Sequence, residues 1–458
     1  MRGTIPSETG PVGDRIAPGP RGHWLLGHLR EFRRDVLGLL MKSAREYGDV
    51  VRLRLGPHVV HLLNHPDHAE HVLRKHAANY DKRTRSTRFS RMVTGESVLT
   101  GDGELWKRRR RMLQPAFHHQ NLAALTDRMT ASTGEMLEAW RGRATTGHPF
   151  DVASEMMRLT YVIVGRTLFS AEVGADAGEI ERALRVLLPQ AFVRLGRIFN
   201  PPDWFPTPDN VRFRAALRSI DRVVYRLISQ HRRNQAAGEP ELDLLALLLA
   251  MRDEETGAGL SDRELRNEAV TFLLAGHETT ANALTWTFHL LSRHPDVENR
   301  LREELAGVLA GRAPILDDLS RLPYLEQVIQ ESMRLYPPVW IIERRVIAED
   351  ALGGFRLPAG SAVVIAPYAL HRHPEFWVRP EAFEPSRFEV PAPDAYIPFG
   401  MGPRSCIGNE FAMLEARLVT AMIVQAFRLR WVPGHPVEPM PGLTLRSRNG
   451  LMMTAHEA

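Results

Sequence analysis

The sequence predicts a mainly α-helical domain with a minor β part, an α+β protein. Apolar residues recur at helical spacing almost continuously from about residue 66 to residue 294, and one predicted helix in that stretch is unusually long. Strand-like patterns are few and short. No internal repeat, low-complexity tract or convincing linker divides the chain. We therefore expect one large domain over residues 23–458, preceded by a Pro- and Gly-rich arm over residues 1–22.

The composition is that of an ordinary globular protein. Of the 458 residues, 44% are hydrophobic and 25% are charged, which excludes a disordered or fibrous chain. The net charge, 59 − 54 = +5, is small for this length and argues against a protein that coats nucleic acid. The single cysteine, Cys406, excludes a disulfide framework and any zinc or iron–sulfur site built from several cysteines.

The sequence shows no transmembrane segment and no signal peptide. The longest purely apolar run, Leu244–Met251, is far shorter than the roughly 20 residues that span a bilayer. Residues 1–20 are rich in Pro and Gly and lack the apolar core of a signal peptide. We expect a cytoplasmic protein without a membrane anchor.

The first elements after the arm are helical and then extended. Trp24–Tyr47 alternates apolar and charged residues at helical spacing. Val50–Leu55 and Val59–Leu63 predict two strands, and Gly56-Pro57 between them predicts a hairpin. The helical stretch that follows is interrupted by turn-forming residues at three places. These breaks are Thr94–Gly103, Asn200–Asn210 and Glu254–Gly259.

One long helix is predicted in the second half of the chain. Ser261 and Glu264 form a capping box, and nothing ends the helical pattern before His294-Pro295. The resulting helix of roughly 34 residues is about 50 Å long, enough to cross a whole domain. Gly276 lies in its middle, where Gly costs about 1 kcal/mol relative to Ala.

Beyond this helix, further helices alternate with short strands. Strand-like segments flank Pro358–Gly360. Asn449-Gly450 lies between two extended runs in Leu443–Thr454, which predicts a type I′ hairpin.

The lone cysteine lies in a glycine-rich loop. Gly400, Gly402 and Gly408 allow a tight turn close to the sulfur of Cys406, and a helix pattern over residues 409–428 follows directly. The N-terminal end of that helix would stabilise a thiolate. These features favour a metal ligand or a nucleophile over a buried small hydrophobe, and no cysteine-hydrolase motif surrounds the residue.

Phe399, Gly402, Arg404, Cys406 and Gly408 form the pattern F-x-x-G-x-R-x-C-x-G, which resembles the haem-binding loop of the cytochrome P450 family. The resemblance implies a single-domain fold that holds haem b between a long distal helix and this proximal loop. It implies that Cys406 is the axial ligand of the haem iron, that Phe399 packs beside the sulfur, and that Arg404 contacts a haem propionate.

The middle of the long helix carries a second motif, Ala275-Gly276-His277-Glu278-Thr279-Thr280. A Thr beside a Gly can open a local groove in a helix for a small ligand. The pattern A-G-x-E-T-T resembles the family's oxygen-binding motif, which implies that Ala275 and Gly276 lie against the haem. It implies that Thr279 hydrogen-bonds the bound oxygen and that Glu278 helps relay protons to it. The other two polar residues, His277 and Thr280, are expected to be structural.

Glu331 and Arg334 form an E-x-x-R pair on one face of a predicted helix over Tyr324–Leu335. The same spacing occurs six times in the chain, so the pattern alone indicates nothing. Downstream, Pro385-Ser-Arg387-Phe388 resembles the family's P-x-R-F element. The resemblance implies that Glu331, Arg334 and Arg387 form a buried charge network that retains the haem.

The basic run Trp106-Lys-Arg-Arg-Arg110-Arg111 places Trp106 and Arg110 on one face of a helix. The pattern W-x-x-x-R matches the family, which implies that both side chains point at haem propionates. We expect the other cations of the run to dock an acidic electron-transfer protein, with a solvated face as the alternative. Arg345 is a weaker propionate candidate, since Arg344 is adjacent and the register is open.

The resemblance implies a haem-thiolate monooxygenase, which inserts one oxygen atom from O2 into a C–H bond or C=C of a hydrophobic molecule such as a terpenoid, fatty acid or polyketide. Electrons would come from NAD(P)H through ferredoxin or flavodoxin and its reductase, because no reductase motif follows in the about 50 residues after Cys406. We expect a monomer. The expected lining of an apolar substrate cavity is Val98, Leu99, Phe192, Phe272, Leu274, Val339, Trp340, Ile341, Ile342 and Met452.

Two other functions compete with this interpretation. A haem enzyme of the same fold could use peroxide or rearrange a substrate without reductive O2 activation, but it would need no relay of Glu278 and Thr279. A nucleic-acid binder could use the arginine run, but it offers no role for the motif over residues 275–280.

Overall fold

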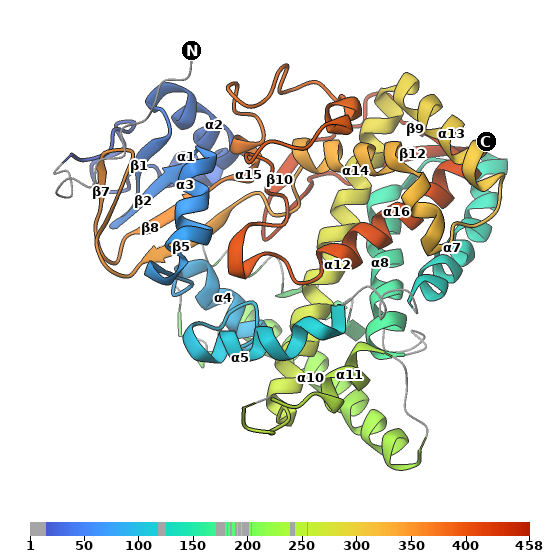
Figure 1. Cartoon of the computed structure of the whole chain (residues 1–458), viewed down its shortest axis with the longest axis horizontal. Coiled ribbons are helices and arrows are strands. Elements are labelled where there is room, and N and C mark those ends of the chain that lie inside the picture. The colour runs from blue at the N-terminus through green and yellow to red at the C-terminus, as the bar shows by residue number, and fades with distance from the viewer. Residues whose placement is uncertain are drawn as a thin grey trace.

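The computed structural model describes residues 15–117, 125–170 and 179–458, except 181, 184, 185, 188, 189, 191–193, 195–200, 203, 239–242 and 254. Most helices gather on one side of the molecule and the largest sheet lies on the other (Figure 1). The helices are α1 (Leu29–Arg34), α2 (Val36–Tyr47), α3 (Pro66–Glu70), α4 (Arg85–Thr94), α5 (Gly103–Leu113), α7 (Thr126–Thr146), α8 (Val152–Phe169), α10 (Pro208–Ala236), α11 (Leu244–Ala250), α12 (Asp262–Arg293), α13 (Pro295–Leu309), α14 (Pro323–Leu335), α15 (Pro367–Leu370) and α16 (Asn409–Ala426).

The strands are short, as the sequence predicts, and form four small sheets. They are β1 (Val50–Leu55), β2 (His58–Leu63), β3 (Tyr80–Asp81), β4 (Phe150–Asp151), β5 (Ile342–Val346), β6 (Asp350–Leu352), β7 (Phe355–Leu357), β8 (Ala362–Ile365), β9 (Phe427–Trp431), β10 (Pro439–Pro441), β11 (Leu445–Ser447) and β12 (Met452–Glu457). The fold class is the predicted one, mainly α with a minor β part.

The largest sheet has the strand order β1-β2-β8-β5-β3. The hairpin of β1 and β2 turns at Gly56-Pro57, as the sequence predicts, and Leu55 pairs with His58 across it. β2 and β8 are parallel, whereas β5 pairs with both β8 and β3 in antiparallel register. Because β5 crosses this sheet directly after α14, it brings Glu343 and Arg344 to the central cavity described below.

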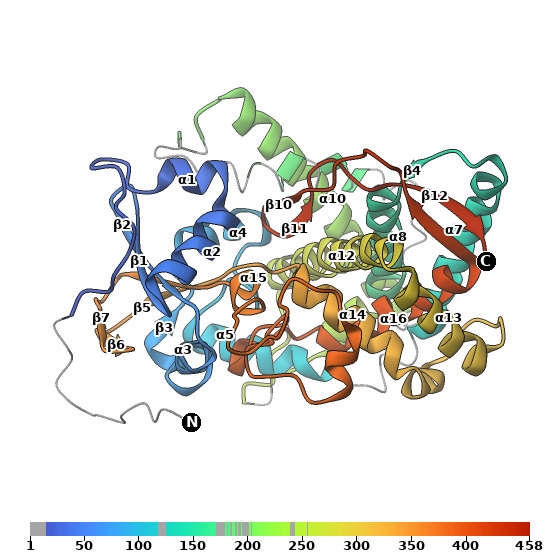
Figure 2. The same ribbon diagram turned by 90° about the horizontal axis from the view of Figure 1, so that it is seen from above.

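The long helix α12 spans 32 residues, close to the predicted length. The capping box is present: the Ser261 backbone N–H donates to Glu264 at 2.8 Å, and the Ser261 side chain accepts from the Glu264 N–H at 3.4 Å. The helix runs through the middle of the helical part and packs against α8, α10, α14 and α16 (Figure 2). A Cβ on Gly276 would lie 3.3 Å from Val164 Cγ2, so the glycine lets α8 approach closely.

The predicted hairpin at Asn449-Gly450 is wrong. β11 pairs with β10, and β12 pairs with β9 and β4, so the two strands that flank Gly450 belong to different sheets. Among the described non-glycine residues, only Ser170, Ala310 and Arg379 have positive φ, so Asn449 lacks the backbone geometry of a type I′ turn. The Asp151 carboxylate instead accepts the Leu451 N–H at 2.8 Å and holds the chain on β4.

The described part of the N-terminal arm is packed on the sheet. Ala17 is buried, and the carbonyl of Pro18 accepts the Arg52 N–H at 2.7 Å. The carbonyl of Arg15 accepts the Arg356 N–H at 3.0 Å. Residues 15–22 are therefore continuous with the body of the protein, while residues 1–14 lie outside the described residues.

Candidate active site

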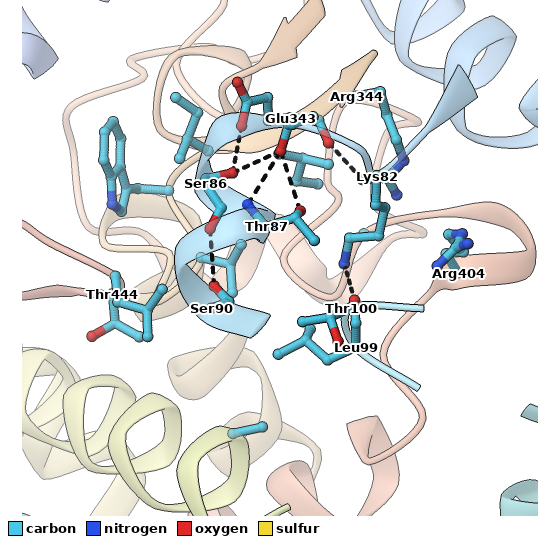
Figure 3. Close-up of a pocket in the computed structure, with 18 of the residues that line it drawn as sticks. Lys82, Ser86, Thr87, Ser90, Leu99, Thr100, Glu343, Arg344, Arg404 and Thr444 are labelled. Atoms are coloured by element: carbon cyan, nitrogen blue, oxygen red, sulfur yellow. Dashed lines mark hydrogen bonds between the residues drawn. The ribbon is translucent and has the colours of Figure 1, made fainter. Parts of the chain in front are cut away.

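A large cavity lies between α12, the loop that contains Cys406, α4 and β5 (Figure 3). Its volume is about 970 Å³, the upper end of the range for ligand pockets. Apolar side chains line most of it, and polar groups gather at a few places on its wall.

Eight of the ten apolar residues predicted to contact substrate line this cavity. They are Val98, Leu99, Phe272, Leu274, Val339, Trp340, Ile341 and Ile342. Met452 is not among the described lining residues, because β12 pairs it with Asp151 of β4. The C-terminal segment contributes Gly442–Thr444 to the wall in its place. Phe192 lies outside the described residues.

The Cys406 loop is tightly folded. The Cys406 N–H donates to the Phe399 carbonyl at 2.9 Å, and α16 begins three residues after the cysteine. Gly402 has φ 71°, and a Cβ there would lie 2.0 Å from the carbonyl oxygen of Leu73, so only glycine fits. The thiol is exposed to the cavity, which Phe399 also lines.

Burial outweighs the groups that would favour a thiolate at Cys406. The Gly408 N–H and the Arg110 charge both lower the pKa of the thiol, but desolvation raises it above its ordinary value. The start of α16 thus opposes the effect of burial without reversing it. A cation bound at the sulfur, such as a metal ion, would favour the thiolate.

Cations collect at one side of the cavity (Figure 3). The Arg404 guanidinium stacks over Trp106, 4.2 Å from the ring centroid, and donates to Asp102 at 2.8 Å. Arg110 donates to the carbonyl of Ser405 at 2.8 Å. The predicted residues Arg404, Trp106 and Arg110 thus meet beside Cys406.

Two further cations, Lys82 and Arg344, join this cluster. Lys82 Nζ donates to the Leu99 carbonyl at 2.6 Å. Burial, then repulsion from Arg344 and Arg404, lowers the pKa of Lys82 to about 7. Burial and Arg404 lower the pKa of Arg344 to about 10. Sequence reasoning missed Lys82, because no motif surrounds it.

The predicted candidate Arg345 lines the cavity but is engaged by a carboxylate of the chain. The Arg345 guanidinium pairs with Asp81 of β3, with an Nη2–Oδ2 distance of 2.5 Å and an Nε–Oδ1 distance of 3.0 Å. The neighbouring Arg344 is buried and lies toward Lys82 and Arg404 (Figure 3). Both arginines line the cavity, and Arg344 is the one whose charge is not taken up by Asp81.

On the opposite wall, α12 presents Ala275, Gly276 and Thr279 to the cavity. Ala275 is exposed although it lies in the middle of a helix that is otherwise largely buried. The Thr279 hydroxyl donates to the Ala275 carbonyl at 2.5 Å, which leaves its oxygen lone pairs available to a ligand. These residues of the motif therefore face the cavity, while α12 stays a continuous helix.

Glu278 is buried and held from the C-terminal segment. The Thr444 hydroxyl donates to Glu278 Oε1 at 2.7 Å and accepts from Asn282 at 2.9 Å. Thr444 lies 166 residues from Glu278, so no local pattern could reveal it. His277 is structural, as expected, since its Nε2 bonds the Met157 carbonyl at 2.9 Å.

The predicted charge network of Glu331, Arg334 and Arg387 is present. Arg334 Nε and Nη2 bond the two oxygens of Glu331 at 2.6 and 2.9 Å, and Arg387 Nε bonds Glu331 at 2.9 Å. Arg334 also donates to backbone carbonyls of the segment before the cysteine loop. Those carbonyls belong to His371, Pro380 and Ala382.

The remaining cations of the basic run form ion pairs within the chain, yet Lys107 and Arg111 stay solvent-exposed, so their docking role stays a prediction. Arg109 is buried and bonds Glu264 and Glu268, at 2.7 and 2.5 Å. Arg111 pairs with Asp253 at 3.1 Å. The other pairs in this region are Arg108 with Asp253 and Glu264, Arg111 with Glu255, and Lys107 with Glu104.

The residues at this site fit a haem. The group carries two carboxylates, and the cavity offers the cations Lys82, Arg110, Arg344 and Arg404; among the described residues Asp102 is the acid paired with one of them. It also carries a metal ion, and the cavity offers the thiol of Cys406 as a ligand. The largely apolar lining, to which both Cys406 and Ala275 belong, suits a flat apolar macrocycle.

Comparison with known proteins gives matches over almost the entire chain. A family model described as Cytochrome P450 matches residues 17–455. Cyclooctatin synthase of Streptomyces melanosporofaciens is 37% identical over 437 residues, covering 94% of this chain and 93% of the relative. Cyclooctat-9-en-7-ol 5-monooxygenase of the same organism is 37% identical over 417 residues, covering 90% and 88%. Pentalenene oxygenase of Streptomyces avermitilis is 34% identical over 424 residues, covering 91% and 92%.

None of the helices in the described part of the chain combines the length and the apolar character required to cross a bilayer.

Proposed function

Since this chain belongs to the cytochrome P450 family and is a haem-dependent monooxygenase of a hydrophobic molecule, we propose that its substrate is a terpenoid. Two relatives are named for oxidising pentalenene and cyclooctat-9-en-7-ol, a cyclic hydrocarbon and a cyclic alcohol. The apolar wall formed by Leu99, Phe272, Trp340 and Ile342 suits such a skeleton, because it binds by burial and shape. The net reaction is RH + O2 + 2 e⁻ + 2 H⁺ → ROH + H2O.

The observation that carries this proposal is the cavity in which Cys406 faces Ala275 and Thr279 of α12. Cys406 would hold the iron of a haem b through its sulfur, and Phe399 would pack beside that sulfur. Arg404, Arg110 and Trp106, with Lys82 and Arg344, would bind the propionates through charge-assisted hydrogen bonds. When bound, the haem supplies the iron chemistry that activates O2 and transfers one oxygen atom.

The chain's own contribution to the reaction is proton delivery. The Thr279 hydroxyl is fixed by the Ala275 carbonyl and can turn to donate into the cavity. Glu278 is the adjacent carboxyl, and the Thr444 hydroxyl holds it in place. We assign Thr279 as the last proton donor and Glu278 as the group that replenishes it.

Electrons would originate from NAD(P)H and reach the chain through a ferredoxin or flavodoxin. A shallow depression over the cysteine loop offers a docking place near the thiol. It is lined by Trp106, Lys107, Arg110, Arg111, Gln114, Pro115, Gly402, Pro403 and Ser405. Three cations of the basic run, Lys107, Arg110 and Arg111, line this depression, so docking would combine its shape with their charge.

A spectroscopic experiment tests the proposal. The dithionite-reduced protein with carbon monoxide should show the strongly red-shifted Soret band of thiolate-ligated haem, and Cys406→Ala should lose it. Terpenoids added to the ferric protein should then shift the iron spin state, whereas fatty acids and macrolides should not. An imidazole-type band in the intact protein would overturn the role of Cys406. A shift with fatty acids alone would overturn the substrate class.

A further inference from the structure

One corner of the cavity carries a carboxylate beside two serine hydroxyls, and both polar and apolar residues surround it. Ser86 and Ser90 lie on one face of α4, and Glu343 of β5 lies next to Ser86 (Figure 3). We call these three residues the polar corner. All three line the cavity and are only half-buried. Phe89 and Ile342, next to them in the chain, line it as well and are apolar.

The polar corner retains hydrogen-bonding capacity. The Ser86 hydroxyl donates to Glu343 Oε2 and lies 3.0 Å from the Thr84 hydroxyl. The Ser90 hydroxyl donates to the Ser86 carbonyl at 3.3 Å, so its oxygen can still accept. A carboxylate offers about four lone-pair sites, and Ser86 uses one of those on Glu343.

The charge of this corner favours a neutral ligand group. Arg85 also lines the cavity, where burial and the charge of Arg88 lower its pKa and the charge of Glu343 raises it. These cations offset the charge of Glu343, so the corner does not call for an ammonium group, and Glu343 itself disfavours a second carboxylate beside it. A hydroxyl suits the corner because it can donate to Glu343 and accept from a serine.

A pure hydrocarbon would displace water from these groups and replace none of their hydrogen bonds. The lost hydrogen bonds make hydrocarbon binding unfavourable at this corner. A hydroxyl on the ligand would replace some of these hydrogen bonds. The corner therefore discriminates by the presence of a hydroxyl.

We propose that the polar corner binds a hydroxyl group that the terpenoid substrate already carries before this enzyme oxidises it. The inference rests on the proposed terpenoid function and specifies its substrate. The reaction that supplies this substrate must then be an earlier hydroxylation, or a cyclisation that ends by addition of water. This enzyme would add the second oxygen atom.

Spin-state titrations of the haem-loaded protein test the inference. The ligands are a sesquiterpene skeleton, cedrane, and a diterpene skeleton, abietane, each as the hydrocarbon, an alcohol and the methyl ether of that alcohol. We expect the alcohol to bind about tenfold more tightly than the hydrocarbon or the ether on at least one skeleton, because a hydrogen bond to a carboxylate is lost in the other two.

Glu343→Leu should abolish this preference and bind the hydrocarbon at least as well as the wild type does. Ser86→Ala should reduce the preference for the alcohol. This second variant still tests the inference if Glu343→Leu fails to fold. Glu349→Gln is the matched control, since Glu349 pairs with Arg356 outside the cavity, and it should change nothing.

The outcomes separate the two proposals. Equal affinity for hydrocarbon and alcohol in the wild type, or a preference that survives in Glu343→Leu and Ser86→Ala, would overturn the polar corner and leave the terpenoid function standing. No spin shift with any terpenoid would overturn both.

Discussion

Arg344 and Arg345 are neighbours on β5, yet they serve different partners. Successive side chains of a strand point to opposite sides, and here both arginines line the cavity while making different contacts. The sequence pattern does not distinguish Arg344 from Arg345 as a propionate ligand. Arg345 forms an ion pair with Asp81, which lies 264 residues earlier in the chain. Such a pairing cannot be predicted from local spacing.

These two arginines give a matched pair of variants. Arg344→Gln should weaken haem retention by about tenfold or more, since it removes a charge-assisted contact to a propionate. Arg345→Gln should leave haem retention unchanged, since its partner is Asp81. The measurement is the rate of haem transfer to an acceptor protein. Equal loss in both variants would contradict the assignment of Arg344.

Thr279 is the residue at which the proton relay can be tested most directly. Thr279→Ala should retain haem and substrate binding but divert most of the consumed electrons into hydrogen peroxide, because the last proton donor is missing. The ratio of product formed to NAD(P)H consumed checks this.

Thr285→Ala is the control for that variant. Its hydroxyl donates to the carbonyl four residues earlier, at 2.7 Å, in the same way as Thr279, but it is buried and is not among the described lining residues. Coupling that is unchanged in Thr279→Ala would favour the peroxide-using alternative.

At the level of elements, α5 and α12 are joined by a buried ion pair. Arg109 is 2% exposed and Glu268 is fully buried, and the pair connects the start of α12 to the helix that carries Trp106 and Arg110. Burial raises the pKa of Glu268, while the Val98 N–H and Arg109 lower it. The basic run therefore stabilises the packing of α5 in addition to the propionate contacts proposed for Trp106 and Arg110.

Arg109→Met should lower the free energy of unfolding by about 3–5 kcal/mol, because it leaves Glu268 buried and unpaired. Adding Glu268→Gln should recover part of this loss, since the amide carries no charge. Lys107→Met is the control: its pair with Glu104 is well exposed, and such pairs contribute about 0–1 kcal/mol. Urea denaturation measures all three, and a loss below about 1 kcal/mol in Arg109→Met would argue against the buried pair.

The elements differ in how well their sequence predicts them. Helix α12 was predictable because its capping box and its periodicity are local, and the cysteine loop was predictable because five fixed residues lie within ten positions. The turn at Gly450 was not, since Asp151 of a distant strand determines where the chain goes. Thr444 and Lys82 were missed for the same reason: their partners are set by the fold and not by neighbouring residues.

At the scale of the whole molecule, several buried histidines make stability depend on acidity. His371 is fully buried, accepts the Ile397 N–H at its Nε2 at 3.0 Å and contacts the carbonyl of Arg334 at its Nδ1. This arrangement requires a neutral ring that donates from Nδ1. Burial, then the Arg334 charge, lowers the pKa of His371 to about 3. Burial likewise lowers the pKa of His61 and of His289 to about 4.

The folded pKa of each ring lies below the value of about 6.5 in the unfolded chain. The unfolded chain therefore gains protons first as the pH falls, and the native state loses stability between about pH 6.5 and pH 4. Each histidine contributes up to about 1.4 kcal/mol per pH unit in that window.

Urea denaturation at pH 7.5, 6 and 5 measures this dependence. His371→Gln should flatten it, whereas His58→Gln, at an exposed position, should not. An unfolding free energy that stays constant from pH 7.5 to pH 5 would contradict the prediction.

The single cysteine of the chain faces an internal cavity and would be held by iron. Any cysteine introduced on the surface would then be the one thiol open to a labelling reagent. The protein can thus carry one fluorescent or spin label at a chosen position without first removing native cysteines. A label at the exposed Glu96, just beyond α4, would report movement of the cavity wall when ligand binds.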